Sequence, residues 1–241
     1  MKAAIPILFL SMLIPAALTM EAAGDALDLG FSTNTILIES ETGRDCELPF
    51  EYLINDDGSF ENGYAWSHDG ALEPYYGAWA ESFPQGWVRS LAFWFTQTGD
   101  WAGQSLDAYI WEYDAGNPGN VRCLIPDQII DMPAYWPTFS AHEVEVNCDT
   151  GDLHFAGFWG NWPDEQNGWF LAADEDGPGV GDPRTNISPL ATEWPQGWHH
   201  PNILPPFEEC KNLGIHECWV AGVHPTAANQ ATWGSIKSLY R

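Results

Sequence analysis

The stretch LDAYIWE at residues 106–112 alternates aliphatic residues with acidic and aromatic ones. Successive side chains of a β-strand point to opposite faces of its sheet, so the aliphatic residues share one face. Asp107, Tyr109 and Trp111 then share the other face. The pattern therefore predicts a half-buried strand, Leu106–Tyr113, whose second face is aromatic.

The turn formers of residues 115–119, AGNPG, separate this strand from an apolar run at Val121–Ile125. Gly adopts positive φ readily and Pro fixes φ, so we predict a hairpin between the two runs. Short β-type runs recur along the chain, whereas no segment of about 12 residues carries a helical stripe. The other predicted strands are Thr35–Glu39, Val88–Thr96, Glu143–Asn147, Leu153–Trp159, Trp169–Ala173 and Ile215–Val223.

Many short strands, together with 23 Gly and 18 Pro that punctuate them, predict one all-β domain. An antiparallel β-sandwich of jelly-roll or immunoglobulin-like type fits this pattern. The run Leu91–Phe95 is continuously apolar, which is typical of a central strand covered on both faces. The fourteen Trp residues supply bulk for a core and argue against intrinsic disorder.

The 34 acidic residues outnumber the 8 basic ones and give a net charge of -26. A chain this acidic repels phosphate backbones and anionic lipid surfaces, so nucleic acid and membrane surfaces are excluded as partners. Residues 1–24 predict a signal peptide, with Lys2 before an apolar run and small residues at the cleavage site. No later segment is apolar enough to span a membrane, so we expect a secreted or cell-surface protein.

The predicted organisation is a signal peptide at 1–24, an amino-terminal arm or first strand at 25–45, a β-sandwich at 46–231 and a carboxyl tail at 232–241. Export permits disulfides. Cys210 and Cys218 bracket a short turn, and Cys123 and Cys148 each end a predicted strand, so these are the two expected pairs. Cys46 is left over, and no cysteine spacing suits zinc.

Sequence patterns for catalysis are lacking, and we expect no catalytic residues and no enzyme activity. There is no Gly-x-Ser-x-Gly and no His-Glu-x-x-His motif. The only cofactor considered is calcium, which prefers oxygen ligands such as those of Asp- and Asn-rich loops. Two loops are candidates, each on its own, and they contain Asn55, Asp57 and Glu61, and Asp174, Asp176 and Asp182.

Two binding hypotheses remain, and the first is self-assembly. An extended apolar segment near the amino terminus could pair with its own sheet or be donated to a neighbouring copy to build a fibre. Its apolar residues are Leu27, Leu29, Phe31, Ile36, Leu37 and Ile38. The alternative is an extracellular glycan, since sugar rings pack on aromatic planes while acids take the hydroxyls. The candidates for that role are Tyr75, Tyr76, Trp162, Asp164, Glu165, Trp194 and Trp198, although burial of these rings in the sandwich is the competing interpretation.

Several separated blocks carry a resemblance, among them residues 55–66, 106–111, 116–119 and 169–178. Together with the terminal Thr232-Trp233-Gly234-Ser235-Ile236-Lys237, they resemble secreted β-sandwich domains of unknown function from environmental bacteria. The resemblance implies export and a sandwich fold, and it implies no chemistry. The expectation is an exported non-enzymatic structural or interaction module that self-assembles, with glycan binding as the alternative function.

Overall fold

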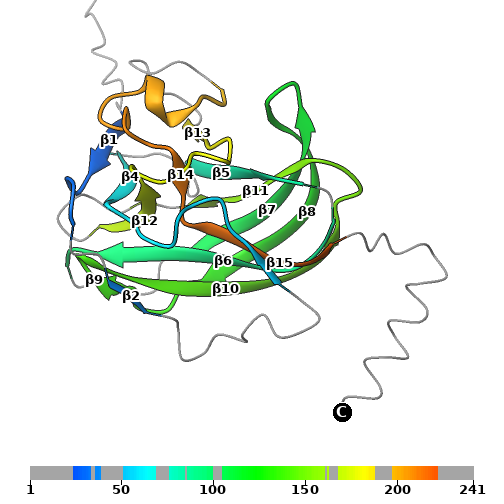
Figure 1. The fold of residues 1–241 in the computed structure, drawn as a ribbon, viewed down its shortest axis with the longest axis horizontal. Coiled ribbons are helices and arrows are strands. Elements are labelled where there is room, and N and C mark those ends of the chain that lie inside the picture. The colour runs from blue at the N-terminus through cyan, green and yellow to red at the C-terminus, as the bar shows by residue number, and fades with distance from the viewer. Residues whose placement is uncertain are drawn as a thin grey trace, which may run out of the picture.

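Two β-sheets packed face to face form the molecule, as the computed structural model shows (Figure 1). The residues described are 24–33, 36–38, 51–68, 76–84, 86–99, 105–160, 162, 168–187 and 197–221. Residues 1–23 of the predicted signal peptide and the whole carboxyl tail lie outside them, whereas Gly24, the last residue of the predicted signal peptide, begins the first strand. The prediction of an all-β sandwich is confirmed, and the one helical turn among the described residues is the 3₁₀ turn η2, Pro201–Ile203.

The larger sheet, sheet A, has the strand order β1-β4-β12-β6-β10-β2. Strand β15 pairs with β6 and β3, β9 pairs with β6, and β14 pairs with β12. The pairings are antiparallel except for β2 on β10 and β9 on β6. The bounds are β1 Gly24–Asp28, β2 Ile36–Ile38, β3 Glu51–Leu53, β4 Asn62–His68, β6 Gly86–Gln97, β9 Ala134–Tyr135, β10 Thr138–Asp149, β12 Trp169–Asp174, β14 Asn212–Leu213 and β15 Ile215–Ala221.

The smaller sheet, sheet B, has the order β13-β5-β11-β7-β8 and is antiparallel throughout. Its strands are β5 Gly77–Phe83, β7 Ser105–Asp114, β8 Asn117–Ile129, β11 His154–Gly160 and β13 Arg184–Ile187. The predicted hairpin is the β7–β8 connection, with Ala115 and Gly116 both at positive φ in the turn. Each predicted strand overlaps an observed one.

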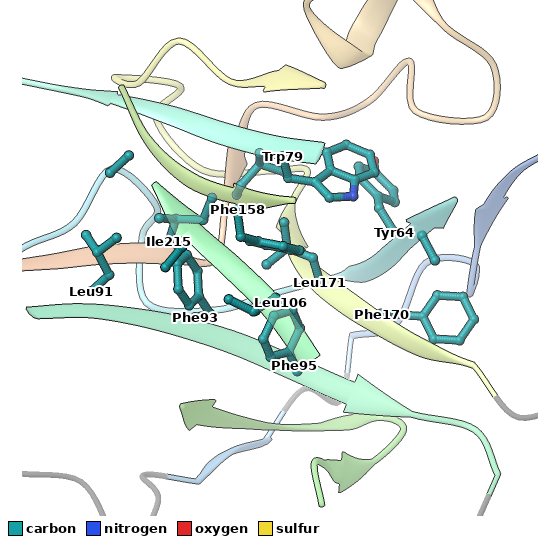
Figure 2. Close-up of a cluster of buried hydrophobic side chains, with 14 of the residues drawn as sticks. Tyr64, Trp79, Leu91, Phe93, Phe95, Leu106, Phe158, Phe170, Leu171 and Ile215 are labelled. Carbon is teal, nitrogen blue, oxygen red and sulfur yellow. The ribbon is translucent and has the colours of Figure 1, made fainter. Parts of the chain in front are cut away.

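The core lies between the sheets and is dominated by aromatic rings (Figure 2). Strand β6 is central in sheet A, as its apolar run predicts, and residues 90–97 are all buried. Its Phe93 ring lies 5.1 Å from the Phe158 ring of β11, and the Phe95 ring lies 5.5 Å from it. Close packing of such rings across the two sheets fixes their separation and their relative position.

One disulfide joins the two sheets. Cys123 of β8 is bonded to Cys148 of β10, which confirms the prediction for this pair. The predicted bridge between Cys210 and Cys218 is wrong, because Cys210 is a free buried thiol and Cys218 takes part in another disulfide. Burial raises the pKa of the Cys210 thiol well above its ordinary value, so this residue is held as an inert core group.

Strand β8 forms one edge of sheet B, and its ladder with β7 shifts register at three places. It contains Pro118 and Pro126, and Asp127 has a φ of 53°. Three large apolar side chains on it are exposed, namely Val121, Leu124 and Ile129. The edge is therefore long and apolar but irregular.

The described residues include no helix with the length and hydrophobicity needed to cross a bilayer.

Candidate functional site

An aromatic face covers the outer side of sheet B. The outward positions of β7 are Asp107, Tyr109, Trp111 and Tyr113, whereas Leu106, Ala108 and Ile110 belong to the core between the sheets. The second face predicted for this strand is thus aromatic as expected. We use the name "aromatic face" for the six rings gathered there, Tyr109, Trp111, Tyr113, Phe155, Trp159 and Trp198.

The rings of the aromatic face contact one another, with two stacked pairs and one ring, Trp198, that contacts two others. Tyr109 and Trp111 are parallel within 4° with their centroids 4.9 Å apart, and Tyr113 stacks on Phe155 at 5.6 Å. Trp198 contacts Trp111 at 5.2 Å and Trp159 at 5.9 Å. These contacts bury some of the rings and hold the others in fixed orientations.

The exposed part of this face is carried by four of its rings. Tyr113 is 41% exposed, and Tyr109, Trp159 and Trp198 are half-buried. Trp198 reaches the face because residue His199 forms a bridge with Thr185 of β13, which folds the segment over the sheet. A rigid, partly solvent-exposed aromatic surface on a sheet is a surface suited to ligand binding.

The residues predicted from the sequence to bind a glycan lie in different parts of the structure. Trp198 lies on the aromatic face. Tyr76 and Trp162 do not, because both are buried in the main core, where Trp162 stacks on Trp169 at 4.0 Å. Their prediction as ligand-binding residues is wrong, since such large rings contribute more by filling the end of the sandwich. Tyr75, Asp164, Glu165 and Trp194 lie outside the described residues.

A second candidate site is an acidic cluster at one end of sheet A. Strand β12 ends at Asp174 and its antiparallel neighbour β4 begins at Asn62, so the loops before β4 and after β12 lie at the same end. Carboxylate oxygens of Asp57, Asp174 and Asp176 all lie within 4.8 Å of one another. The two loops predicted as separate calcium sites therefore meet, and one residue of the first joins two of the second. We call these three residues the acidic cluster.

Burial and neighbouring negative charges disfavour the ionised form of two carboxyl groups at this end of the molecule. Burial raises the pKa of Asp174, and the nearby charge of Asp57 raises it further. The pKa of Glu61 is also raised, first by burial and then by the charges of Asp176 and Asp174. A hard cation would relieve this repulsion, so Asp57, Asp174 and Asp176 are the residues that could hold one.

The remaining residues of the predicted calcium loops have other partners. The Asn55 amide donates to the Ser82 carbonyl, and Glu61 accepts from the Glu175 N–H and the Ser59 hydroxyl. Asp182 is paired with the Arg184 guanidinium. The Glu61 contact with Glu175 joins the two loops, whereas Asn55 is bonded to β5 and Asp182 to β13, so none of the three belongs to the acidic cluster.

Buried polar residues behind the acidic cluster anchor its loops, and no sequence pattern predicts them. His216 donates from Nε2 to Asp56 at 2.6 Å, because its Nδ1 accepts the Trp94 indole N–H. Glu81 accepts backbone N–H groups of Ser82, Asp182 and Leu213. Burial raises the pKa of Glu81 to about 8, although the three N–H groups act in the opposite direction.

A further buried pair links the two sheets. His154 of β11 and Glu217 of β15 are both fully buried, and Nε2 lies 2.7 Å from Oε1. His154 Nδ1 lies 3.1 Å from the Asp152 carbonyl oxygen and donates to it, because a carbonyl can only accept. The pair spans the core and is closed to ligands.

The amino-terminal segment is built into the chain's own sheet. Strand β1 pairs with β4, and its Leu27 packs half-buried against the core, as does Leu29 just beyond it. Strand β2, Ile36–Ile38, pairs with β10, and Leu37 packs beside Phe139. Phe31 is 60% exposed. Leu27 and Ile36–Ile38 of the predicted assembly residues thus lie in strands that are paired within the same molecule, whereas Leu29 and Phe31 follow β1.

Comparisons with protein-family models, with curated proteins and with solved structures found no match to this chain.

Proposed function

We propose that this chain is an exported, non-enzymatic binding module that recognises glycans through the aromatic face of sheet B. The observation that supports this most is the row of fixed, half-buried rings Tyr109, Trp159 and Trp198 on the side of the sheet that faces away from the core. Rings that only filled space would be expected in the main core, where Trp66, Trp79 and Trp169 already lie.

Sugar recognition suits this surface physically. The C–H side of a sugar ring packs against an aromatic plane, and a ring already locked by its neighbours loses little side-chain entropy when a ligand binds. Stacked pairs such as Tyr109 on Trp111 are locked in this way. The protein carries a net charge of -26, so a ligand bound mainly by ring stacking avoids the electrostatic repulsion that an anion would meet.

Truncating Trp159, one of the two half-buried indoles of the aromatic face, tests the proposal. We expect Trp159→Ala to weaken binding to any polysaccharide that the wild type binds by about tenfold, since a stacked aromatic contact contributes about 0.5–1.5 kcal/mol and truncation also removes buried apolar area. Affinity electrophoresis and a glycan array with the mature chain measure the change.

Tyr135→Ala is the matched control, because Tyr135 is 50% exposed but lies on β9 of sheet A. This variant should bind as the wild type does. Failure of the wild-type chain to bind any glycan, or equal loss in both variants, contradicts the proposal.

Self-assembly through the amino-terminal segment is supported less well. Donation of Leu27–Ile38 to another copy would require β1 to leave β4 and β2 to leave β10. Each separation exposes apolar side chains such as Leu27 and Leu37, which now pack against the chain's own core.

Calcium is the ion that we propose for the acidic cluster, in a stabilising role. Extracellular modules bind calcium with dissociation constants of about 10⁻⁴ M. At about 10 mM calcium this gives roughly 2.7 kcal/mol of stabilisation and raises Tm by about 5 °C. Thermal melts with calcium, magnesium or chelator measure the shift.

Asp174→Asn should abolish the shift, because Asp174 is the buried member of the cluster. The exposed Asp152→Asn should retain it. A wild-type Tm that calcium and chelator leave unchanged would remove calcium from the proposal.

A further inference from the structure

Trp159 belongs to a row of outward-facing residues that runs across the strands of sheet B, with a polar residue at each end of the row. In the register of the sheet, Trp159 of β11 lies opposite Asp107 of β7 on one side and Ala78 of β5 on the other. Ala78 in turn lies opposite Asn186 of β13. An acid and an amide therefore flank the ring across the strands, about 14 Å apart at three strand spacings.

The residue between the ring and the amide is small. Ala78 has only a methyl group, so no bulky side chain of β5 separates Trp159 from Asn186. In the next row, Gly157 lies opposite Tyr109, and a Cβ at Gly157 would fall 2.0 Å from the Trp79 carbonyl oxygen. Because these residues are small, the large side chains on this part of the face are Tyr109, Trp159 and Trp198, whose ring contacts that of Trp159.

Tyr109 adds a second surface beside Trp159. Trp111 lies two residues further along β7 and stacks on one side of the Tyr109 ring. Asp107 lies two residues from Tyr109 in the other direction along β7, directly across from Trp159. Tyr109, Asp107 and Trp159 therefore lie around one position on the sheet.

The polar groups of the row match hydroxyl groups. The Asp107 carboxylate is held by the backbone N–H of Asp127, which donates to Oδ1 at 2.8 Å, and is half-exposed. A carboxylate accepts hydrogen bonds, and the half-exposed amide of Asn186 offers both donors and an acceptor. A sugar hydroxyl is both a donor and an acceptor, so it can satisfy each of these groups.

The charge of the molecule selects against anionic ligands. Acidic residues outnumber basic ones 34 to 8, and Asp107 lies within the row itself. The cation nearest in the register, Arg184, is engaged by both carboxylate oxygens of Asp182 and lies over the Phe155 ring. A uronic acid or sulfated sugar would meet repulsion without a compensating cation.

Resting on the proposed function, we infer that Asp107, Trp159 and Asn186 form a sugar subsite whose ligand is an uncharged polysaccharide. The indole packs on the sugar ring, while Asp107 and Asn186 fix its orientation through the hydroxyls on either side. These two polar residues then determine which arrangement of hydroxyls binds. The aromatic rings contribute affinity that depends little on that arrangement.

The experiment compares the mature chain with Asp107→Asn and Asn186→Ala by affinity electrophoresis. The probes are hydroxyethyl cellulose, galactomannan and xylan as uncharged chains, and polygalacturonate and alginate as anionic ones. We expect binding to at least one uncharged chain and to neither anionic one, and about tenfold weaker binding for each variant. Added salt should leave this affinity unchanged, because the ligand carries no charge.

Glu208→Gln removes an exposed carboxylate outside the row and should bind as the wild type does. Thermal melts confirm that each variant is folded. If Trp159→Ala loses binding while Asp107→Asn and Asn186→Ala keep it, the subsite is overturned and the glycan-binding face stands. Binding of the wild type to anionic chains alone overturns the inference on ligand class, and no binding to any polysaccharide overturns both proposals.

Discussion

Replacing Glu217 by alanine is expected to lower the free energy of unfolding by about 4 kcal/mol, because the change leaves a buried ring nitrogen without a partner and opens a cavity in the core. Both partners lie in the core, and His154 would lose its hydrogen bond with the opposite sheet, in which Nε2 lies 2.7 Å from Oε1 of Glu217. Because Nδ1 of His154 already donates to the Asp152 carbonyl, its Nε2 would be left buried without a partner. Urea denaturation of the purified protein measures the loss.

Replacing both residues of this pair by apolar ones is expected to restore stability that the single substitution removes. Glu217 Oε2 has no hydrogen-bond partner among the residues that the structure describes, so the pair is incompletely satisfied there. Apolar replacements that fill the volume are often neutral or stabilising, and His154→Phe with Glu217→Leu should recover most of the stability lost in the single variant. Glu209→Ala, at an exposed acid, serves as the control. A single variant as stable as this control would show that the pair does not hold the sheets together.

Removing the disulfide between the sheets is expected to lower the free energy of unfolding by about 3 kcal/mol in the variant Cys123→Ala/Cys148→Ala. The bond closes a loop with a sequence separation of 25 and ties edge strand β8 to β10 of the other sheet. Its loss increases the entropy of the unfolded chain and leaves β8 held by β7 on one side only.

Variants are preferable to a reducing agent here, because Cys218 takes part in a second disulfide that reduction would also break. Cys210→Ala is the matched control, since it removes a buried cysteine that is not bonded. Equal losses in the control and in the double variant would mean that the effect comes from packing and not from the cross-link.

The hairpin and the central strand could be predicted because local pattern and turn chemistry agree there. Residues 106–112 alternate, residues 115–119 form the turn, and Leu91–Phe95 is continuously apolar. Strands β4 and β5 were not predicted, and the reason is physical. They combine Gly, Ala, Asn and Glu with single large rings, and they are buried through long-range contacts that a local pattern does not report.

The candidate sites likewise depend on long-range strand pairing that a local sequence pattern does not report. The residue types of the acidic cluster were evident in the sequence, but its composition depends on β4 pairing with β12, which brings Asp57 to Asp174. The row around Trp159 depends likewise on the register of β7, β11, β5 and β13. Turn spacing suggested a bridge from Cys210 to Cys218, whereas Cys218 lies in β15 and is bonded elsewhere.

The irregular edge of sheet B has a consequence for behaviour at high concentration. Val121, Leu124 and Ile129 would make a straight β8 a template on which a second molecule could add its own strand. The prolines and the three register shifts interrupt the evenly spaced N–H and C=O groups that such templating needs. Kinks in the backbone thus protect the protein from amyloid-like growth at the edge where its side chains would otherwise promote it.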